Sequence, residues 1–381
     1  MPEVTFHNTD GLTSEVLRNT MVETVDQMGR ITVDNEGGFA SALTVFPMVN
    51  MNAPEEGYYT FGGVSGGMPA AAPDAESPLG TLTLPSKRNY DTHSYKRKIN
   101  PKKEAEVELD GDDVPFSLFN YGATYLQMET FIRREIAAWR GDEHIEGLIG
   151  PDGQTAHSDI SSEDNVYTSY DPWSDTSDTT NATPYEDVVH VSHDLKTQGR
   201  FMGNQSRPFM FAGPDVLRDM RLNPNLQERL GSTQNSTLNV SDLSGLMSDD
   251  LAGIREVAVQ VPRTNDDGEM VDDTGGTVSD AEDAAMDNIL EPYDVSADTK
   301  RRNVIIGSPG PNSAFMPWFL SKLTTMADNA PTSSSISVDN QRGFLTQLWA
   351  GDDPISTYMA AKQDIGLHIR RPENWAILQE I

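Results

Sequence analysis

The chain has 381 residues and a formal net charge of −31, from 59 acidic and 28 basic side chains. This length allows two or three packed units, and the Trp, Phe, Tyr and Leu residues spread along it argue against a disordered acidic chain. The acidity disfavours a general nucleic-acid binder. It favours a folded protein of a halophile, because molar salt screens the self-repulsion of such a charge.

The residues that are absent exclude further classes of protein. The chain has no cysteine, which removes disulfides, thiol catalysis and thiolate metal sites. It has no run of eighteen apolar residues, so we expect no membrane span. The N-terminus "MPEVTFHNTDGLTSEVL" has no basic region followed by an apolar one, so we expect no secretory signal.

The first hundred residues predict an arm, a strand and a long excursion. Residues 1–40 are polar and weakly patterned, and "FASALTVFPMV" (39–49) then predicts a buried strand. Residues 52–95 are rich in Gly, Pro, Ser and Ala. A compact domain rarely carries so long a loop without a use for it, so this stretch is either a linker or a projecting arm.

Basic residues crowd together after this excursion. Seven of the 28 Lys and Arg residues lie between Lys87 and Lys103. They form either a solvated loop or a contact for an acidic surface, which in this chain could be another copy of itself. The alternation in "KKEAEVEL" then predicts a strand over 103–109.

The strongest periodic signal lies between residues 119 and 141. Its apolar positions follow one another by three or four residues, and Gly141 is placed to end a helix. We predict a helix of about five turns with this stripe buried. The stripe consists of Tyr121, Tyr125, Met128, Ile132, Ile136 and Trp139.

The rest of the chain mixes helices and strands. "GPDVLRDMRLNPNLQERL" reads as helical, "REVAVQVPR" and "NVIIGSPG" as strands, and "NSAFMPWFLSKL" as an apolar segment. This order predicts an α+β fold. The final "DIGLHIRRPENWAILQEI" predicts a packed element at the very end of the chain, where most domains have loosely held residues.

The enzyme and metal motifs are weak. "GVSGG" around Ser65 matches a nucleophile elbow, but Pro69 and Pro73 prevent the helix that must follow it. In "HVSHD", His190 and His193 would share a metal on a helix, but the flanking valines read as a strand, which points them to opposite faces. We therefore expect no catalytic residue, no metal site and no cofactor.

Two other patterns carry little information. "LDGDD" and "NDDGEMVDD" lack the spaced acids, central glycine and closing glutamate of a calcium loop. Four glycosylation sequons, at Asn181, Asn204, Asn235 and Asn239, are unremarkable in a chain so rich in Ser and Thr.

The order of parts resembles the major capsid protein of tailed double-stranded DNA viruses, the Hong-Kong-97 fold. "SYKRKINPKKEAEVELDGDDVPFSLFNYGATYLQMETFIRREI" is similar to the strand that returns from the family's extended loop into its spine helix, and "DIGLHIRRPENWAILQEI" is similar to its closing strands. Together with the acidity, this resemblance points to a virus of a halophilic archaeon.

The resemblance implies a division of the chain into domains. It implies that Ile365, Leu367 and Ile369 lie in the peripheral sheet, and that the chain crosses at Pro372 into the axial domain. The parts are an N-terminal arm (1–40), a peripheral strand (41–51), the extended loop (52–98), the peripheral domain with its spine helix near 119–141 (99–165), the axial domain (166–340), peripheral return strands (341–371) and an axial closing strand (372–381).

The resemblance also implies a function and partners. The chain would assemble into pentamers and hexamers of an icosahedral shell around double-stranded DNA, and scaffold, portal and decoration proteins would be further partners. It would be assembled in the host cytoplasm. The arm begins almost at Met1, so we expect a separate scaffold protein or none. The expected inter-subunit contacts are Tyr58, Tyr59, Phe61, Lys87, Arg88, Lys96, Arg97 and Lys98.

Three alternatives stay open from the sequence. A halophilic surface or adhesion protein fits the sequons but not the missing signal segment. A serine hydrolase would be built on Ser65. A jelly-roll capsid protein fits poorly with a five-turn helix before the main strand region.

Overall fold

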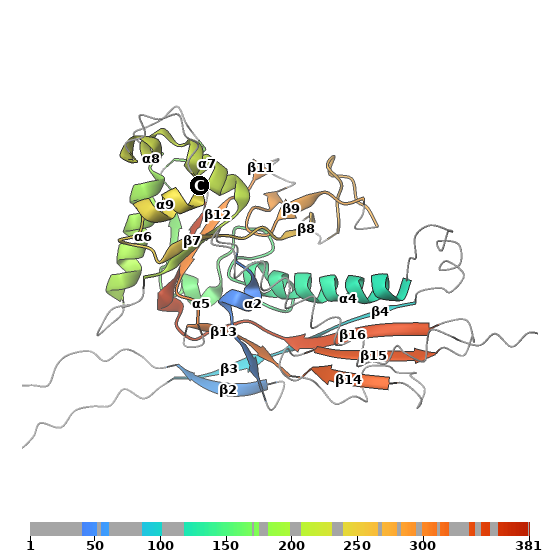
Figure 1. Cartoon of the computed structure of the whole chain (residues 1–381). Helices are drawn as coiled ribbons and strands as arrows, with labels where there is room; N and C mark the ends of the chain where they lie inside the picture. The colour runs from blue at the N-terminus through green and yellow to red at the C-terminus, as the bar shows by residue number, and fades with distance from the viewer. Residues whose placement is uncertain are drawn as a thin grey trace, which may run out of the picture.

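The computed structural model describes most of the chain from residue 40 onward (Figure 1). The predicted N-terminal arm up to residue 39, the Ser65 motif and the predicted strand at 103–109 lie outside the described residues. Among the described residues, no helix is long and apolar enough to cross a membrane. The described residues are 40–51, 55–60, 86–100, 118–169, 171–174, 182–198, 207–230, 239–265, 269–279, 283–294, 299–310, 313–319, 335–339, 344–350, 357–379 and 381.

A seven-stranded sheet forms the long lower layer of the molecule in Figure 1. Its longest strand, β16, pairs antiparallel with β15 and with β4, and β14 continues the sheet beyond β15. At the other end, β13 pairs with the end of β16, with β17 and, in parallel, with β1. The strands are β1 (Met48–Asn50), β4 (His93–Ile99), β13 (Ala314–Trp318), β14 (Ser335–Asp339), β15 (Phe344–Ala350), β16 (Thr357–Ile365) and β17 (His368–Ile369).

A long helix lies along β4 and β16 in Figure 1. It begins as α4 (Leu118–Glu135) and continues into the π-helix η1 (Ile136–Arg140). It ends at Gly141, whose φ of +71° favours glycine. A Cβ there would come within 2.4 Å of the Ile145 carbonyl oxygen. The helix predicted near 119–141, with Gly141 as its stop, is confirmed.

The face that α4 buries differs from the predicted stripe. Tyr125 and Met128, which the periodicity places in the core, are 38% and 40% exposed. The helix instead buries Leu126, Thr130 and Arg134. The apolar period identified the helix correctly. The second half of the stripe is buried as predicted, because Trp139 is in the core and Ile132 and Ile136 pack against it, whereas Tyr125 and Met128 are exposed.

A five-stranded sheet forms the second unit, in the order β5-β18-β12-β6-β7. The terminal strand β18 lies inside this sheet, parallel to β5 and antiparallel to β12. The strands are β5 (Val166–Thr168), β6 (Phe209–Ala212), β7 (Gly253–Glu256), β12 (Asn303–Gly307) and β18 (Trp375–Gln379).

Helices cover one face of the five-stranded sheet (Figure 1). Because side chains alternate along a strand, Val304 and Ile306 of β12 pack against the helices while Ile305 points to the opposite face. The predicted helical segment around 213–230 is confirmed as two helices. The helices are α6 (Pro184–Gln198), α7 (Pro214–Leu222), α8 (Pro224–Arg229) and α9 (Val240–Leu246).

The opposite face of this sheet belongs to a core shared with the seven-stranded sheet. Four aromatic rings join the two units there. The ring centroids of Phe46 and Trp139 are 5.4 Å apart, those of Phe46 and Trp375 are 5.6 Å apart, and those of Trp139 and Phe211 are 5.4 Å apart. Aromatic contacts at such distances add about 0.5–1.5 kcal/mol each beyond area burial.

Short elements make up the remainder. "REVAVQVPR", predicted as one strand, is two: β7 ends at Glu256 in the five-stranded sheet, and β8 begins at Gln260 and pairs with β9. The short elements are α2 (Ala42–Val45), β2 (Glu55–Thr60), β3 (Ser86–Asp91), α5 (Ser158–Ser161), β8 (Gln260–Pro262), β9 (Met286–Asn288), β10 (Tyr293–Asp294), β11 (Thr299–Lys300) and η3 (Pro372–Asn374).

Two local predictions are wrong. The buried strand predicted at 39–49 is the short helix α2 followed by β1, since Ser41 and Thr44 form a capping box that starts a helical turn. His190 and His193 lie on helix α6 rather than on a strand. Pro184 opens that helix and acids follow in its first turn, which outweighs the β-branched valines.

The end of the chain is a packed element, as predicted. Ile365 closes β16, Ile369 lies in β17, and both belong to the shared core with Leu367. Pro372 begins η3, after which β18 enters the other sheet. Strand membership cuts across the predicted ranges in two places. β13 and β14 fall within 166–340, and β4 falls almost wholly within 52–98, but all three belong to the seven-stranded sheet.

Candidate inter-subunit surface

The strands β2 and β3 form a two-stranded ribbon beside the main sheet (Figure 1). Four of the predicted contact residues lie in it, because Tyr58 is opposite Arg88 and Tyr59 is opposite Lys87 in the antiparallel register. Phe61 lies outside the described residues. The ribbon therefore brings the predicted aromatic and basic residues together at the level of backbone pairing.

The root of the ribbon is fixed to the main sheet. Tyr90, near the end of β3, is 1% exposed, and its ring meets that of His368 edge-on with centroids 5.6 Å apart. A Cβ on Gly366 would come within 2.6 Å of the Asp91 carbonyl oxygen. This position thus needs a glycine for the close approach of the two chain segments.

The three bases Lys96, Arg97 and Lys98 lie one element further along than the sequence suggested. They belong to β4, paired with β16 inside the seven-stranded sheet, and not to the extended loop predicted to end at residue 98. The resemblance predicts that the stretch from Ser94 is the strand returning from the extended loop, and the structure has a strand there, β4 (His93–Ile99). What the sequence did not indicate is that this strand pairs with β16.

Within the chain, these bases face different neighbours. Arg97 Nε lies 3.3 Å from a carboxylate oxygen of Glu129 on α4. On the opposite face of the sheet, Lys98 Nζ lies 4.0 Å from the centroid of the Tyr358 ring. Exposed pairs of this kind contribute about 0–1 kcal/mol, so the bases can exchange them for contacts with another molecule at little cost.

Buried polar groups lie on the side of α4 that faces the sheet. Arg134 Nε donates to Gln363 Oε1 over 2.8 Å, and Gln363 Nε2 donates to the Thr130 carbonyl oxygen over 3.2 Å. These buried hydrogen bonds fix the rotation of the helix about its axis. Consequently Tyr125 and Met128 face outward, and the pKa of Tyr125 is raised by its hydrogen bond with Glu129.

Nothing in the sequence pattern could have revealed this outward apolar pair. The periodicity places both residues in the core, and the polar residues that replace them there look like a solvated face.

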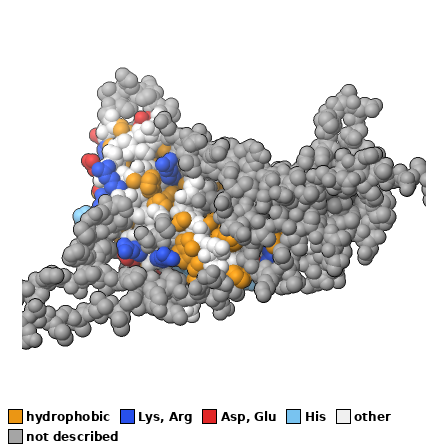
Figure 2. Space-filling view, turned by 60° about the horizontal axis from the view of Figure 1, so that its bottom comes forward, with side chains coloured by type: hydrophobic (Ala, Val, Ile, Leu, Met, Phe, Trp, Pro, Cys, Tyr) orange, Lys and Arg blue, Asp and Glu red, His pale blue; other side chains and the backbone are white. Residues whose placement is uncertain are grey.

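Figure 2 shows that, on the underside of the molecule, hydrophobic side chains gather with Lys and Arg side chains beside them on the described part of the surface. The chain is strongly acidic as a whole.

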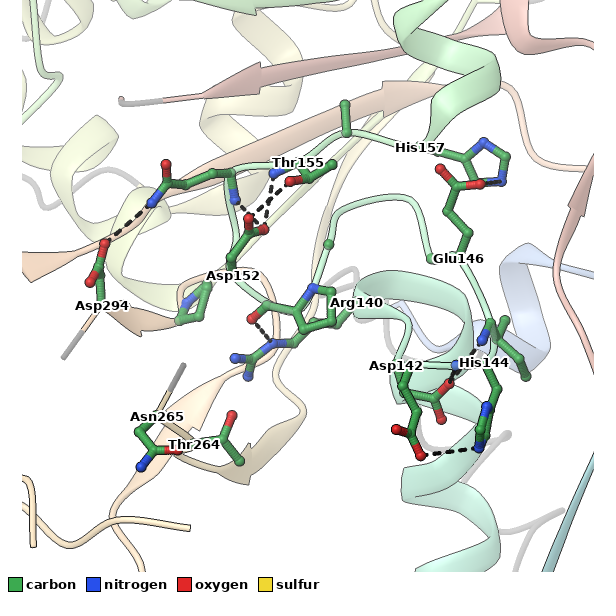
Figure 3. A pocket seen from close by; sticks show the side chains of 18 of the residues that line it. Arg140, Asp142, His144, Glu146, Asp152, Thr155, His157, Thr264, Asn265 and Asp294 are labelled. Atoms are coloured by element: carbon green, nitrogen blue, oxygen red, sulfur yellow. Dashed lines mark hydrogen bonds and ion pairs between the residues drawn. The ribbon is translucent and has the colours of Figure 1, made fainter. Parts of the chain in front are cut away.

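A cavity of about 780 Å³ opens beside the end of η1 (Figure 3). Arg140 donates from Nε to the Pro151 carbonyl oxygen over 2.7 Å, and burial lowers the pKa of its guanidinium. Asp152 accepts hydrogen bonds from the backbone N–H groups of Gln154 and Thr155. These charged side chains hold the loops that line the cavity, which is a structural role.

Asp142 has a similar structural role at the rim of this cavity. Burial alone would raise the pKa of its carboxyl group, but hydrogen bonds from Tyr95 and from the N–H groups of His144 and Ile145 hold it below its ordinary value. Among the described residues, no group of three or more His, Asp or Glu side chains is arranged to hold a metal ion.

Comparison with known proteins gives a result at the level of structure. No family model and no curated protein matches the chain. The chain is similar to the crystal structure of a phage-related protein from Bordetella bronchiseptica RB50, with a TM-score of 0.52 and 10% identity over 96% of this chain and 97% of that chain. The chain has the Hong-Kong-97-like fold.

Two further solved structures are similar to this Hong-Kong-97-like chain. One is the capsid of a native GTA particle, at 12% identity and a TM-score of 0.49 over 90% of this chain and 92% of that chain. The other is a putative capsid protein of a prophage of E. coli CFT073, at 10% identity and a TM-score of 0.48 over 96% and 98%. The fold class predicted from the sequence is confirmed.

Proposed function

We propose that the chain is the major capsid protein of a tailed double-stranded DNA virus and that it self-assembles into the pentamers and hexamers of an icosahedral shell around DNA. The observation that carries this proposal is the match in fold, which spans 96% of this chain and 97% of a phage-related protein. On this proposal the chain is a structural protein and not an enzyme. It resides in the virion and is assembled in the host cytoplasm.

The sheets and helices then divide into the parts of a capsid subunit. The seven-stranded sheet with α4 would be the peripheral domain, and the five-stranded sheet with α6–α9 the axial domain. The ribbon β2–β3 would be the extended loop, ending near Asp91. The N-terminal arm (1–40) keeps its predicted boundary. The other parts follow the predicted ranges, except that β13 and β14 join the peripheral domain.

The ribbon supports contact between subunits. A two-stranded ribbon is marginally stable by itself in water, and this one pairs with no other strand among the described residues. A neighbouring subunit would supply the missing surface. Many such contacts around a closed shell raise the effective concentration of each, so individually weak contacts suffice.

The outward face of α4 supports a second contact. Tyr125 and Met128 are exposed on adjacent turns of one helix, and burying apolar area contributes about 25 cal/mol per Å². Ion pairs weaken as salt rises. If the acidity reflects a halophilic archaeal host, apolar contacts of this kind would carry more of the shell's cohesion than Lys96 and Lys98 do.

The first test is electron microscopy of the purified protein in molar salt, with sedimentation velocity on the same sample. We expect rings of five and six subunits, or closed shells. A protein that sediments as a monomer in both low and molar salt, at all concentrations reached, would contradict self-assembly.

Variants then locate the contacts. Tyr125→Ser with Met128→Ser should reduce assembly strongly in molar salt, whereas Leu222→Ser with Met286→Ser serves as a matched control on exposed apolar residues elsewhere. Lys96→Glu with Lys98→Glu should impair assembly mainly in low salt. Unaltered shells from both test variants would reject these contact sites while leaving the capsid assignment in place.

A further inference from the structure

Four histidines from separate parts of the chain line one hollow at the root of the ribbon. This hollow of about 480 Å³ lies where the end of β3, the loop after η1, the start of α5 and the corner between β16 and β17 meet. The four are His93, His144, His157 and His368. Histidine is the side chain that changes charge near neutral pH, and the chain has only seven of them.

The contact between the first two histidines joins the start of β4, two residues after the ribbon ends at Asp91, to the loop after η1. The rings of His93 and His144 are stacked, with centroids 5.3 Å apart and an interplanar angle of 13°. Each also has a carboxylate nearby in its own segment. His93 Nε2 lies 3.3 Å from Asp91, and His144 Nε2 lies 3.1 Å from Glu143.

Protonation of both rings would have opposite effects on the local ion pairs and on the contact between the two segments. When both rings are charged, each gains a partner within its own segment, whereas the contact between the segments becomes a pair of stacked cations. Like charges at this distance repel, more strongly where water is partly excluded. Charge on both rings would therefore strengthen the local pairs and weaken the contact that joins the segments.

His368, on the other side of the ribbon's root, also holds the ribbon better when it is neutral than when it is protonated. Its ring lies between Tyr90 and Phe315, with centroid distances of 5.6 and 6.0 Å, and its Nε2 is 3.5 Å from the Asp91 carbonyl oxygen. Burial lowers the pKa of His368 to about 4, and Asp91 offsets this only in part. The neutral ring is thus the form that holds Tyr90 in place.

The sign of the resulting pH dependence follows from this lowered pKa. The folded form resists protonation of His368 until about pH 4, while the unfolded form takes up the proton below pH 6.5. The unfolded form therefore binds more protons between about pH 4 and pH 6.5. The stability of this contact is full above pH 6.5 and falls as pH drops from 6.5 toward 4.

The other charged groups around the hollow do not reverse this loss of stability at low pH. His157 accepts a hydrogen bond at Nδ1 from the Asp159 N–H, and its Nε2 is 3.8 Å from Glu146. Asp142, on the same loop, is already paired with Arg133 at 3.0 Å. Near His368, Arg370 lies over the Phe315 ring at 4.4 Å and adds positive charge.

We propose that this histidine cluster is an acid-sensitive latch that fixes the β2–β3 ribbon to the seven-stranded sheet at neutral pH and releases its root on mild acidification. The latch is a property of the single chain, because every group in it belongs to one subunit. It therefore holds or fails independently of shell formation.

The test is hydrogen exchange measured by mass spectrometry on the full chain, with labelling times scaled to the intrinsic rate at each pH. Between about pH 7.5 and about pH 5, peptides covering 88–96 should lose protection on the order of tenfold relative to peptides from β12. β12 lies in the middle of the five-stranded sheet, away from the hollow, and serves as the internal reference.

Two variants and a control identify the groups responsible. His368→Phe keeps an aromatic ring between Tyr90 and Phe315 but cannot be protonated, and it should remove most of the acid-induced loss. His93→Gln with His144→Gln changes two partly exposed rings and should reduce the loss. His190→Gln, on α6, should behave as the unmodified chain. Protection at 88–96 that is unchanged at pH 5, or an equal loss in all variants, would overturn the latch.

Discussion

Glu135 holds the backbone N–H of Ala42 with both of its carboxylate oxygens, at 2.8 and 2.9 Å. It also accepts a hydrogen bond of 2.7 Å from Trp139 Nε1. The carboxyl group is 0% exposed, and it lies at the last residue of α4 before the π-helix. One buried acid therefore joins the start of the described chain to the point where the long helix changes its winding.

This carboxyl group should make stability depend on pH in an unusual direction. Burial raises the pKa of Glu135 to about 8, despite the hydrogen bonds from Ala42 and Trp139. The folded form then keeps the proton that the unfolded form loses above pH 4.5, so this group lowers the free energy of unfolding as pH rises from about 4.5 to about 8. Glu135→Gln should remove that component.

Chemical denaturation across this pH range tests the point. The difference in unfolding free energy between Glu135→Gln and the unmodified chain should shift in favour of the variant as pH rises, and Glu163→Gln, an exposed residue of the loop after α5, should show no such trend. Glu135→Ala should cost about 2–5 kcal/mol, because it leaves the Ala42 and Trp139 donors unpaired. A pH-independent difference for Glu135→Gln would show that the carboxyl group is ionised throughout.

The pairing of Gly307 with Trp375 gives a second prediction. The two residues are opposite each other in β12 and β18, and a Cβ on Gly307 would come within 2.2 Å of the Trp375 ring. Gly307→Ala should therefore destabilise the protein by about 1–3 kcal/mol or more. Gly245→Ala is the matched control: nothing lies within 4 Å of its Cβ, and alanine in helix α9 should stabilise by about 0.5–1 kcal/mol. Thermal unfolding should separate the two, and equal shifts would reject the steric argument.

Local sequence patterns predicted which helices and strands form better than they predicted which side chains those elements bury. The period of α4 and the apolar run of β12 are carried by adjacent residues, so both could be read from the sequence. The burial of Arg134 and the exposure of Met128 could not, because the side chain that accepts from Arg134 Nε is Gln363, 229 positions further along the chain. A helix's inward face is set by its partner as much as by its own period.

The candidate site shows the same limit. Composition identified an excursion and a cluster of bases, and the resemblance predicted a returning strand that carries Lys96 and Lys98. No local pattern could show that this strand pairs with β16 inside the seven-stranded sheet. The histidine cluster offers no local signal at all, since His144 and His368 meet only through the topology. The strand misreading of His190 arose because β-branched neighbours suggest a strand where the helix is stabilised by its first turn.

A buried ion pair in the β8–β9 hairpin gives a third prediction. Arg263 donates to both oxygens of Asp287, at 3.1 and 3.0 Å, and Asp287 is only 3% exposed. Arg263→Met should cost about 3–5 kcal/mol, because it leaves the buried carboxylate without its cation. Adding Asp287→Asn should recover most of this loss, since the amide is neutral and its oxygen still accepts from the Tyr293 N–H. Urea denaturation of both variants measures this, and a double variant no more stable than the single one would contradict it.

Deletion of residues 374–381 tests the role of the terminal strand. β18 lies between β5 and β12, so its loss would leave facing edges of two strands without hydrogen-bond partners. It would also remove Trp375, whose Nε1 donates to Ser313 Oγ over 2.7 Å and whose ring stacks on Phe46. We expect no soluble folded protein from this deletion.

Substitutions of Trp375 measure how much of the stability supplied by β18 comes from this one side chain. Trp375→Ala should cost about 3–5 kcal/mol. Trp375→Phe keeps a ring against Phe46 and should cost less, about 1–3 kcal/mol, chiefly for the lost hydrogen bond to Ser313. Circular dichroism and sedimentation of each variant give the measurement. A truncated chain recovered as soluble, assembling protein would mean that the five-stranded sheet closes without β18, and that the end of the chain is dispensable for the fold.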